Sequence, residues 1–463
     1  MSWGEAERAI ANRTSLFANR ALNEVKKCSW SENRHSPIDE LLGLPRFAGR
    51  EGAAFKPGLG RIRALLGAMD DPQQQFRSAH VAGSHGKGTT SALVAAVGSA
   101  AGRRTGLHTS PHLFAVNERM RIDGAPASND WLAGAVRRHR DLFERVGPSF
   151  FEATVALSLL YFAEKQAAAA VVEVGLGGRL DATNILQPAA CAVTSVHLEH
   201  TALLGSTLAE VAREKAGIFK KGVPAVVGAD VPPEALAALR DIAGETRAPL
   251  HRVGEETTLH RVGQDEAGLR LDLQTPLRRY RGLRVPLYGR HQAGNAAAAA
   301  RFAELFWSDA RSSARPMRDG FAGVRRLAGL RGRFEVLGRR PLVVADVAHH
   351  PDALAATLRA RADHFPRQQG RLVVAFGLMR DKDAAACAKL LAEAEAEVWP
   401  VALESGRALP PDALADVLRE RGVARGPAGT AEAHRQRFLA GADPDDVLLV
   451  CGSHRVVAGL RDA

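Results

Sequence analysis

Short apolar runs alternate with longer Ala- and Leu-rich stretches between residues 38 and 310. The paired segments are SAHVAG with TTSALVAAVGSAAG, ATVALSLLYFAEKQ with AAAAVVEVG, and CAVTSV with LAEVAREKAGIF. Such alternation of buried strands and helices is typical of a mostly parallel sheet with helices on both faces. We therefore expect an α/β fold for residues 38–310.

The pattern changes around residues 250–290, where LRLDLQTPLRRYRGLRVPL alternates polar and apolar positions. A period of two predicts strands, and we expect antiparallel hairpins that form a small appendage. Strand and helix patterns restart in residues 311–463 with PLVVADVAHH, RLVVAFGLM, AEVWPVALE and DDVLLVCGS, which predicts a second, smaller α/β domain. Residues 1–37 are polar and helix-prone, and we expect a helical extension there.

Length and composition agree with a folded protein of two domains. The chain has 463 residues, of which 46% are hydrophobic and 24% charged, and this is too long for one ordinary core. No apolar run approaches the roughly 20 residues that cross a bilayer, and the start MSWGEAERAIANR does not resemble a signal peptide. We expect a cytoplasmic protein without a membrane partner.

The cysteines and the net charge exclude further classes of function. The four cysteines are far apart and form no CxxC pair, which indicates free thiols rather than disulfides or a zinc site. The net charge of +11 comes from scattered arginines, with no dense basic block interleaved with aromatic residues. We therefore expect no nucleic-acid partner, and a basic surface that favours small anionic substrates.

A glycine-rich segment, HVAGSHGKGTT at residues 80–90, follows the first predicted strand and opens a helix. Glycines at such a position let backbone N–H groups close around phosphates. Lys87 would neutralise the phosphates, and the hydroxyl of Thr89 or Thr90 would reach Mg²⁺. The strict GxxxxGK[ST] spacing is not met, because valine replaces the first glycine and Gly88 follows the lysine. A mere glycine-rich turn is the alternative.

Acidic and imidazole side chains follow two further predicted strands. Glu173 closes AAAAVVEV, and His197, Glu199 and His200 follow CAVTSV. Open α/β sheets bind ligands at the carboxyl ends of their strands, and these side chains can ligate metals. Taken alone, a strand-end glutamate is about as often structural. The Glu-Lys pair at residues 214–215 fits a solvated helix end.

Together these segments resemble the folylpolyglutamate synthase and dihydrofolate synthase family, a branch of the Mur-type amide ligases. The resemblance runs from about Leu41 to the C-terminus. Its blocks, in order, are HVAGSHGKGTT, TGLHTSPHL with NERMRIDG, FFEAT, VVEVGLGGRLDATN, LEHTALLGSTLAEVAREKAGI, GRHQAGNA, and DVAHHPDAL with GLMRDKD. It implies a Mur-ligase-like P-loop ATPase domain at 38–310 and a Rossmann-like glutamate-ligase domain at 311–463.

The resemblance also implies ATP and two Mg²⁺ ions as cofactors, and site residues by matching position. Nucleotide contacts are implied for Gly83, Ser84, His85, Gly86, Lys87, Gly88, Thr89, Thr90, Asn295, Arg333 and Asp346. Metal contacts are implied for Thr89, Ser110, Glu173 and His200. Catalytic roles are implied for Lys87, Lys215, Asp346 and His349, with Lys215 as a candidate for carbamylation. Substrate contacts are implied for Pro111, His112, Phe151, Glu152, Thr154 and Asp181.

The implied activity is ATP-dependent ligation of L-glutamate to dihydropteroate and to reduced folyl-polyglutamates. The γ-phosphoryl group would pass to a substrate carboxylate, and the amine of glutamate would attack the resulting acyl phosphate. The GGRLDATN block with Asp181 resembles the bifunctional bacterial type, which we favour. The expected partners are these small molecules, and we expect a monomer.

Three positions depart from the motifs of this family. The loop has Ser84-His85 for the usual Thr-Asn, Glu199 stands for Asp, and His350 stands for Asn in AHNP. Two alternatives follow. One is a Mur-type ligase for another carboxylate, which FFEAT and TSPHL argue against. The other is a non-catalytic nucleotide-binding paralogue, which the retained charges of Lys87 and Glu173 argue against.

Overall fold

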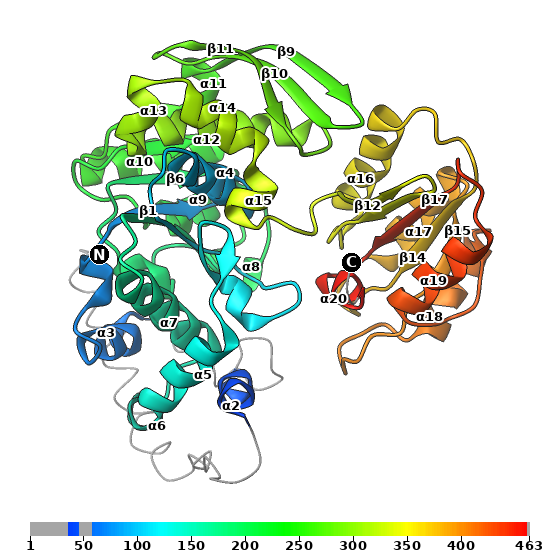
Figure 1. The fold of residues 1–463 in the computed structure, drawn as a ribbon, viewed down its shortest axis with the longest axis horizontal. Helices are drawn as coiled ribbons and strands as arrows, with labels where there is room; N and C mark the ends of the chain where they lie inside the picture. The colour runs from blue at the N-terminus through cyan, green and yellow to red at the C-terminus, as the bar shows by residue number, and fades with distance from the viewer. Residues whose placement is uncertain (1–35, 46–57, 461–463) are drawn as a thin grey trace.

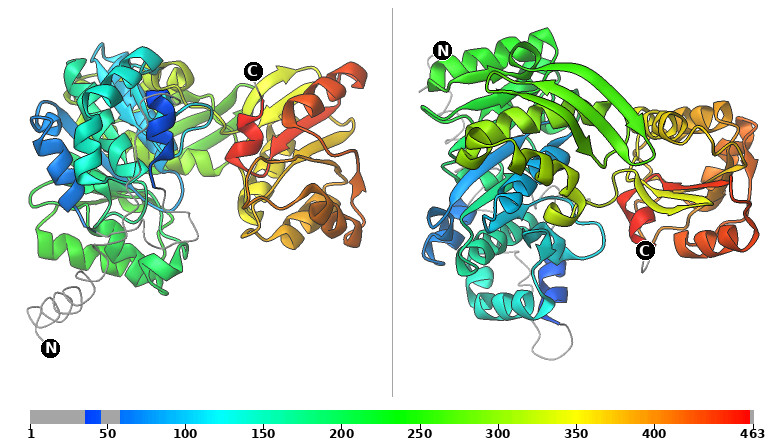
Figure 2. Two further views of the ribbon diagram at one scale, coloured as in Figure 1. Left: turned by 90° about the horizontal axis from the view of Figure 1, so that it is seen from below. Right: turned by 45° about the horizontal axis from the view of Figure 1, so that its top comes forward.

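The structure, a computed structural model, describes residues 36–45 and 58–460. These residues form two α/β lobes that lie side by side in three views (Figures 1 and 2). The expected helical extension at residues 1–37 falls almost wholly outside the described residues. The first described helix, α2 (Pro37–Gly43), is capped by Ser36.

The first domain is built on an eight-stranded sheet in the order β4-β3-β2-β5-β1-β6-β7-β8. The strands from β2 to β8 in that order are parallel, whereas β3 and β4 add an antiparallel edge. Their bounds are β1 (Arg77–Ala82), β2 (Thr105–His108), β3 (Met120–Ile122), β4 (Ala125–Pro126), β5 (Ala169–Glu173), β6 (Ala190–Val193), β7 (Ala225–Val227) and β8 (Leu250–Arg252). The predicted, mostly parallel sheet is confirmed.

Helices cover both faces of this sheet. Alternate residues of the inner strands therefore enter different cores. Val171 of β5 belongs to a core with α4 (Lys87–Ala100) and α12 (His291–Phe306). Val172 belongs to the opposite core, with helices α3 (Gly60–Gly67), α5 (Asn129–Arg138), α6 (Arg140–Val146) and α7 (Phe150–Glu164). A third core packs β6 and β7 against α9 (Leu208–Ala216) and α10 (Pro233–Thr246).

The predicted appendage is a three-stranded antiparallel sheet above α12 (Figure 1). Its strands are β9 (Thr258–Asp265), β10 (Gly268–Gln274) and β11 (Arg279–Val285). Leu269, Leu271 and Leu273 alternate along β10 and bury one face in the core of the first domain. The hairpin prediction is therefore confirmed.

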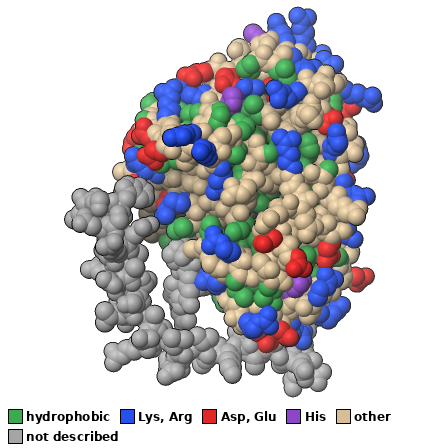
Figure 3. Space-filling view, turned by 90° about the vertical axis from the view of Figure 1, so that its left-hand side faces the viewer, with side chains coloured by type: hydrophobic (Ala, Val, Ile, Leu, Met, Phe, Trp, Pro, Cys, Tyr) green, Lys and Arg blue, Asp and Glu red, His purple; other side chains and the backbone are tan. Residues whose placement is uncertain are grey.

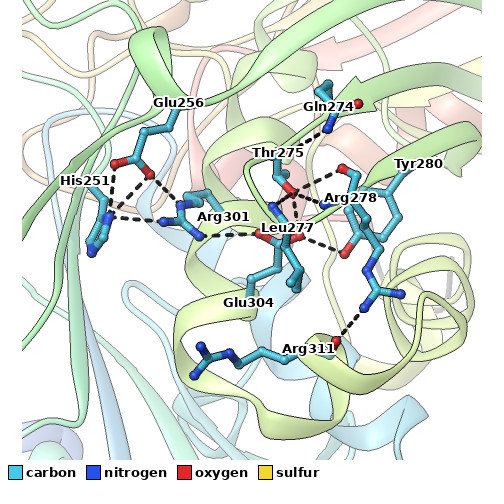
Figure 4. Close-up of polar contacts among 10 residues, drawn as sticks. All are labelled: His251, Glu256, Gln274, Thr275, Leu277, Arg278, Tyr280, Arg301, Glu304 and Arg311. Atoms are coloured by element: carbon cyan, nitrogen blue, oxygen red, sulfur yellow. Dashed lines mark hydrogen bonds and ion pairs between the residues drawn. The ribbon is translucent and has the colours of Figure 1, made fainter.

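A buried polar network joins α12 to this appendage (Figure 4). Glu304 is only 1% exposed and accepts hydrogen bonds from the Thr275 hydroxyl at 2.7 Å and the Tyr280 hydroxyl at 2.9 Å. Burial raises the pKa of Glu304. One turn earlier, the Nε atom of Arg301 donates to Glu256 at 2.6 Å. These contacts fix α12, which carries Asn295 nearer its start.

The expected domain boundary after residue 310 needs correction. Helices α13 (Ser308–Ser312), α14 (Arg315–Ala322) and α15 (Val324–Ala328) share the core of α4. Met317 and Phe321 of α14 are both 0% exposed. Because this apolar face is buried in the first domain, the change between domains follows Ala328.

The second domain has a six-stranded sheet in the order β12-β13-β17-β14-β15-β16, parallel except for β12. Alternate residues of β13 enter two cores, which confirms a second α/β layer structure. The strands are β12 (Glu335–Arg339), β13 (Leu342–Ala345), β14 (Leu372–Phe376), β15 (Glu397–Pro400), β16 (Ala424–Arg425) and β17 (Val447–Cys451). The helices are α16 (Pro351–His364), α17 (Ala384–Glu393), α18 (Pro411–Glu420), α19 (Ala431–Gly441) and α20 (His454–Ala458).

The described cysteines are buried, and the charged side chains are spread over the face shown in Figure 3. Cys191, Cys387 and Cys451 are buried free thiols, as expected, and Cys28 lies outside the described residues. No helix within residues 36–45 and 58–460 is both long and apolar enough to cross a bilayer. On the face drawn in Figure 3, basic side chains are dispersed and acidic ones lie between them.

The packing of α4 predicts opposite effects for two helical glycines. A Cβ atom on Gly98 would lie 2.3 Å from the Trp307 ring, whereas one on Gly134 would meet nothing within 4 Å. We expect Gly98→Ala to lower the free energy of unfolding by about 1–3 kcal/mol because the core is overpacked. Gly134→Ala should raise it by about 0.5–1 kcal/mol. Thermal unfolding followed by circular dichroism checks both, and equal midpoints would contradict the packing.

Candidate active site

The predicted phosphate loop joins β1 to α4, which begins at Lys87. Gly86 caps the helix with φ of 80°, and a Cβ atom there would lie 2.2 Å from Oδ1 of Asn295. Gly83 has φ of 146°, and a Cβ atom there would lie 2.0 Å from Oγ1 of Thr194. Both glycines are therefore required by close approach as well as by backbone angle. The amides of Gly86, Lys87 and Gly88 stand at the start of α4, where anions bind.

Residues after β6 hold this loop in place. The Ser84 amide donates to the Ser195 carbonyl at 2.9 Å, and the Thr194 hydroxyl donates to the His85 carbonyl at 2.6 Å. The His197 amide donates to the Ser84 hydroxyl at 3.0 Å. The ends of β1 and β6 thus form one rigid edge.

The Lys87 ammonium lies inside the loop. It donates to the Gly83 carbonyl at 2.9 Å and to the Ser84 carbonyl at 3.0 Å. Thr89 is 3% exposed, and the buried hydroxyl of Thr90 has no hydrogen-bond partner among the described residues. The segment therefore combines a cation with hydroxyl oxygens at the start of α4.

Glu173 reaches the same loop from the end of β5. Its carboxylate accepts from the Ser110 amide at 3.0 Å, and it lies 3.5 Å from where a Cβ atom on Gly88 would stand. Glu173 is 4% exposed, and burial raises its pKa, whereas Lys87 and the Ser110 amide act in the opposite direction. The carboxylate and the loop converge, as the strand-end argument predicts.

The residues around Glu173 fit Mg²⁺ in their chemistry. Mg²⁺ takes oxygen ligands, with one or two carboxylates, several waters and substrate phosphates. The Glu173 carboxylate and the unpartnered Thr90 hydroxyl are donors of this kind. His200 is exposed at the start of α8 (Thr201–Leu204), and the described part of the chain holds no ready-made group of three metal-binding side chains. The metal set of Thr89, Ser110, Glu173 and His200 stays a prediction.

Lys215 is not part of a solvated helix end. It is 2% exposed on α9, and its ammonium lies 4.0 Å from the Glu199 carboxylate. Burial, reinforced by the charge of Lys87, lowers the pKa of Lys215 to about 8. A lysine with a depressed pKa is reactive as a neutral amine.

The second domain presents Arg333, Asp346 and His349 to this edge. Asp346 accepts from the Phe334 amide at 2.6 Å and the Ala348 amide at 2.7 Å, which fixes its carboxylate. Burial raises the pKa of Asp346, and Arg333 lowers the pKa of both Asp346 and Glu173. Nδ1 of His349 donates to the Val347 carbonyl at 2.8 Å, so the neutral ring keeps its lone pair on Nε2.

A pocket of about 60 Å³ lies between Glu173 of the first domain and Arg333 of the second. Both domains line it, and its residues include Gly88, Ser110, Pro111, His112, Glu173, Arg331, Arg333, Val347 and His454. The sequence analysis did not name Arg331 or His454. His454 follows β17 directly, so its strand-end position was the available signal. Arg331 lies in the linker, where no local pattern marks it.

The predicted substrate residues separate into two groups. Pro111 and His112 line the pocket, and Phe151 lies against Gly175, where a Cβ atom would be 2.4 Å from its ring. Their contact with substrate stays a prediction.

Glu152, Thr154 and Asp181 make hydrogen bonds that stabilise the local structure. Glu152 completes the cap of α7 and pairs with Arg61 at 3.0 Å. Thr154 is 0% exposed and donates to the Phe151 carbonyl. Asp181 accepts from the amides of Gly175 and Leu176 and so holds the glycine turn after β5. The substrate contacts of these three residues also stay a prediction.

Comparison with known proteins agrees with this geometry. The profile of the Mur ligase middle domain matches residues 81–303, and that of the Mur ligase glutamate-ligase domain matches residues 332–454. The chain is 32% identical over 434 residues to the dihydrofolate synthase/folylpolyglutamate synthase of Escherichia coli K12, covering 94% of each chain. A structure of Mycobacterium tuberculosis folylpolyglutamate synthase complexed with ADP and AMPPCP superposes with a TM-score of 0.77 at 30% identity, covering 88% of this chain and 95% of that one.

A longer relative matches as well. The chain is 37% identical over 445 residues to the probable bifunctional folylpolyglutamate synthase/dihydropteroate synthase of Haloferax volcanii. The match covers 92% of this chain but spans only 50% of that relative. The fold and the two matched domains define this chain as a Mur-type ligase. The chain belongs to the dihydrofolate synthase/folylpolyglutamate synthase family.

The position of Glu173 predicts a metal-dependent effect on nucleotide binding. Glu173→Gln keeps an acceptor for the Ser110 amide but removes the negative charge beside the loop. We expect affinity for ATP with Mg²⁺ to fall by at least about 10-fold, the effect of losing one charged contact. Titration calorimetry measures it, with Glu255→Gln, whose side chain is 57% exposed, as the control. Unchanged affinity would place the metal elsewhere.

Proposed function

We propose that the chain ligates L-glutamate to dihydropteroate and to reduced folyl-polyglutamates at the expense of ATP. One observation carries the proposal: Glu173 of the first domain and Arg333 of the second line one interdomain pocket. The charges of Lys87 and Arg333 both act on Glu173, and Arg333 also acts on Asp346. The names of the relatives support the pterin and glutamate substrates. The nucleotides bound in the Mycobacterium tuberculosis structure support ATP.

The charges suit phosphoryl transfer to a carboxylate. Lys87 and Arg333 offset the negative charge on the transferring group, which is the main requirement of this reaction. Mg²⁺, held by Glu173 and a threonine hydroxyl, would polarise the phosphate oxygens. When the glutamate amine attacks the acyl phosphate, the C–O bond to phosphate breaks and inorganic phosphate leaves. Nε2 of His349 accepts the proton that the amine releases. Closure of the domains keeps water from that intermediate.

The bifunctional reading rests on the loop that Asp181 holds. The amides of Gly175 and Leu176 donate to its carboxylate, and Gly175 packs against Phe151. In this proposal the turn borders the place of the acceptor. A Mur-type ligase for another carboxylate is the second candidate. Either reaction uses both domains of one chain, and we infer that a monomer suffices.

Release of ADP with different acceptors tests the proposal. With ATP, Mg²⁺ and glutamate, both dihydropteroate and tetrahydrofolate should stimulate ADP release. Release that ignores both pterins would reject the folate substrates, and no release with any carboxylate would favour a non-catalytic protein.

Lys87→Ala should reduce this ADP release by at least about 100-fold with every acceptor, since the loop then lacks its cation. Lys221→Ala, at an exposed lysine of the same domain, is the matched control and should behave as wild type. Retained turnover in Lys87→Ala would refute the loop assignment.

Lys215 is proposed to carry a carbamate. Because its pKa is lowered to about 8, a larger fraction is neutral amine at neutral pH, and this form attacks carbon dioxide. Native mass spectrometry should show one added carbon dioxide in bicarbonate, increasing as pH rises from about 6 to 9. Lys215→Arg should lose both this addition and the stimulation of activity by bicarbonate. An unmodified Lys215 in active protein would rule out the carbamate.

A further inference from the structure

Five histidine rings form a continuous row from the first domain into the second. Neighbouring ring centroids are 4.7 Å apart for His197 and His85, and 5.3 Å for His85 and His350. His349 lies 5.3 Å from His350, and His454 lies 5.7 Å from His349. All these spacings fall within the range of interacting aromatic rings. The row ends at α20, which faces the first domain (Figure 1).

The row crosses between the domains where His85 meets His350. Their rings are stacked with an interplanar angle of 27°. His85 belongs to the phosphate loop, and His350 caps α16 in the second domain. A stacked pair depends on both separation and angle, so this contact is sensitive to the relative position of the domains.

Both rings are held by their own domain. The amide of His85 donates to the Ser195 hydroxyl at 2.9 Å, and the His197 ring lies behind the His85 ring. Nδ1 of His350 accepts from the Ala353 amide at 3.3 Å. The cap therefore fixes the orientation of His350 and leaves its ring face for His85.

The same two positions are departures noted in the sequence. The family motifs have asparagine at both, and an asparagine side chain offers no ring to stack. Here the two changes occur together in one contact. The contact lies two residues before Lys87, so a shift of His85 also shifts the loop that holds the ammonium.

We propose that His85 and His350 are positioning residues that form an interdomain latch and hold the phosphate loop against α16. The latch rests on the proposed function through the role of this loop in binding ATP. The two rings touch no reacting group in this account. They act by limiting the loop and the second domain to one relative position.

A double-mutant cycle tests the latch. The variants are His85→Asn, His350→Asn and the double substitution. Spin labels at Lys221→Cys and Lys389→Cys, in a Cys28→Ser background, report the interdomain distance by pulsed electron resonance, since the other cysteines are buried. Each single variant should broaden the distance distribution and raise KM for ATP by about 2- to 10-fold, the effect of one ring pair, with a smaller change in kcat.

The pattern of effects separates a latch from a structural side effect. The double variant should be no worse than either single variant, because both remove the same contact. His85→Phe keeps a ring at this position and should retain the narrow distance distribution. His260→Asn, at an exposed histidine of β9, should leave the distance distribution and KM unchanged. Additive effects, or an unchanged distribution in all variants, would overturn the latch. Should the wild-type protein release no ADP with any acceptor, the proposed function fails, while the distances still decide the latch.

Discussion

The structure depends on one constraint: parallel strands bring their carboxyl ends to the same edge of the sheet. Strands β1, β5 and β6 are neighbours. Strand β5 ends at Glu173, and β1 leads into the phosphate loop, which the segment after β6 holds in place. Lys87 would be an isolated cation without Glu173, and Glu173 would be a costly buried carboxylate without the ammonium and the Ser110 amide. Their proximity makes each tolerable and leaves both ready for a charged ligand.

The second domain adds the charge of Arg333 to this arrangement. Arg333 lies near one carboxylate of each domain and lowers the pKa of both. The first domain also extends further than a simple division suggests, because α14 and α15 bury their apolar faces on α4. The short linker after Ala328 therefore starts from a rigid base. The hydrogen bonds of Glu304 to Thr275 and Tyr280 anchor α12 to the appendage. This anchoring holds Asn295, on the same helix, beside the phosphate loop.

Alternating strands and helices, the hairpin appendage and the phosphate loop could all be predicted from sequence, since each depends on a local period or spacing. The boundary at residue 310 could not, because the polar passage around α14 hides an apolar face whose partner lies more than two hundred residues earlier. Lys215 was equally hidden, since its burial depends on Glu199 in another segment. Glu152 and Asp181 carried family motifs, yet their oxygens are engaged by a helix cap and a turn. The motifs did not indicate these hydrogen bonds, and the substrate contacts stay a prediction.

The most direct measurement is a crystal structure with a non-hydrolysable ATP analogue and Mg²⁺. We expect the phosphates on the amides of residues 86–88, with Mg²⁺ at about 2.1 Å from an oxygen of Glu173 or one bridging water away. Arg333 should then contact the nucleotide from the second domain. A triphosphate bound away from this loop, with Glu173 facing no metal, would contradict the account.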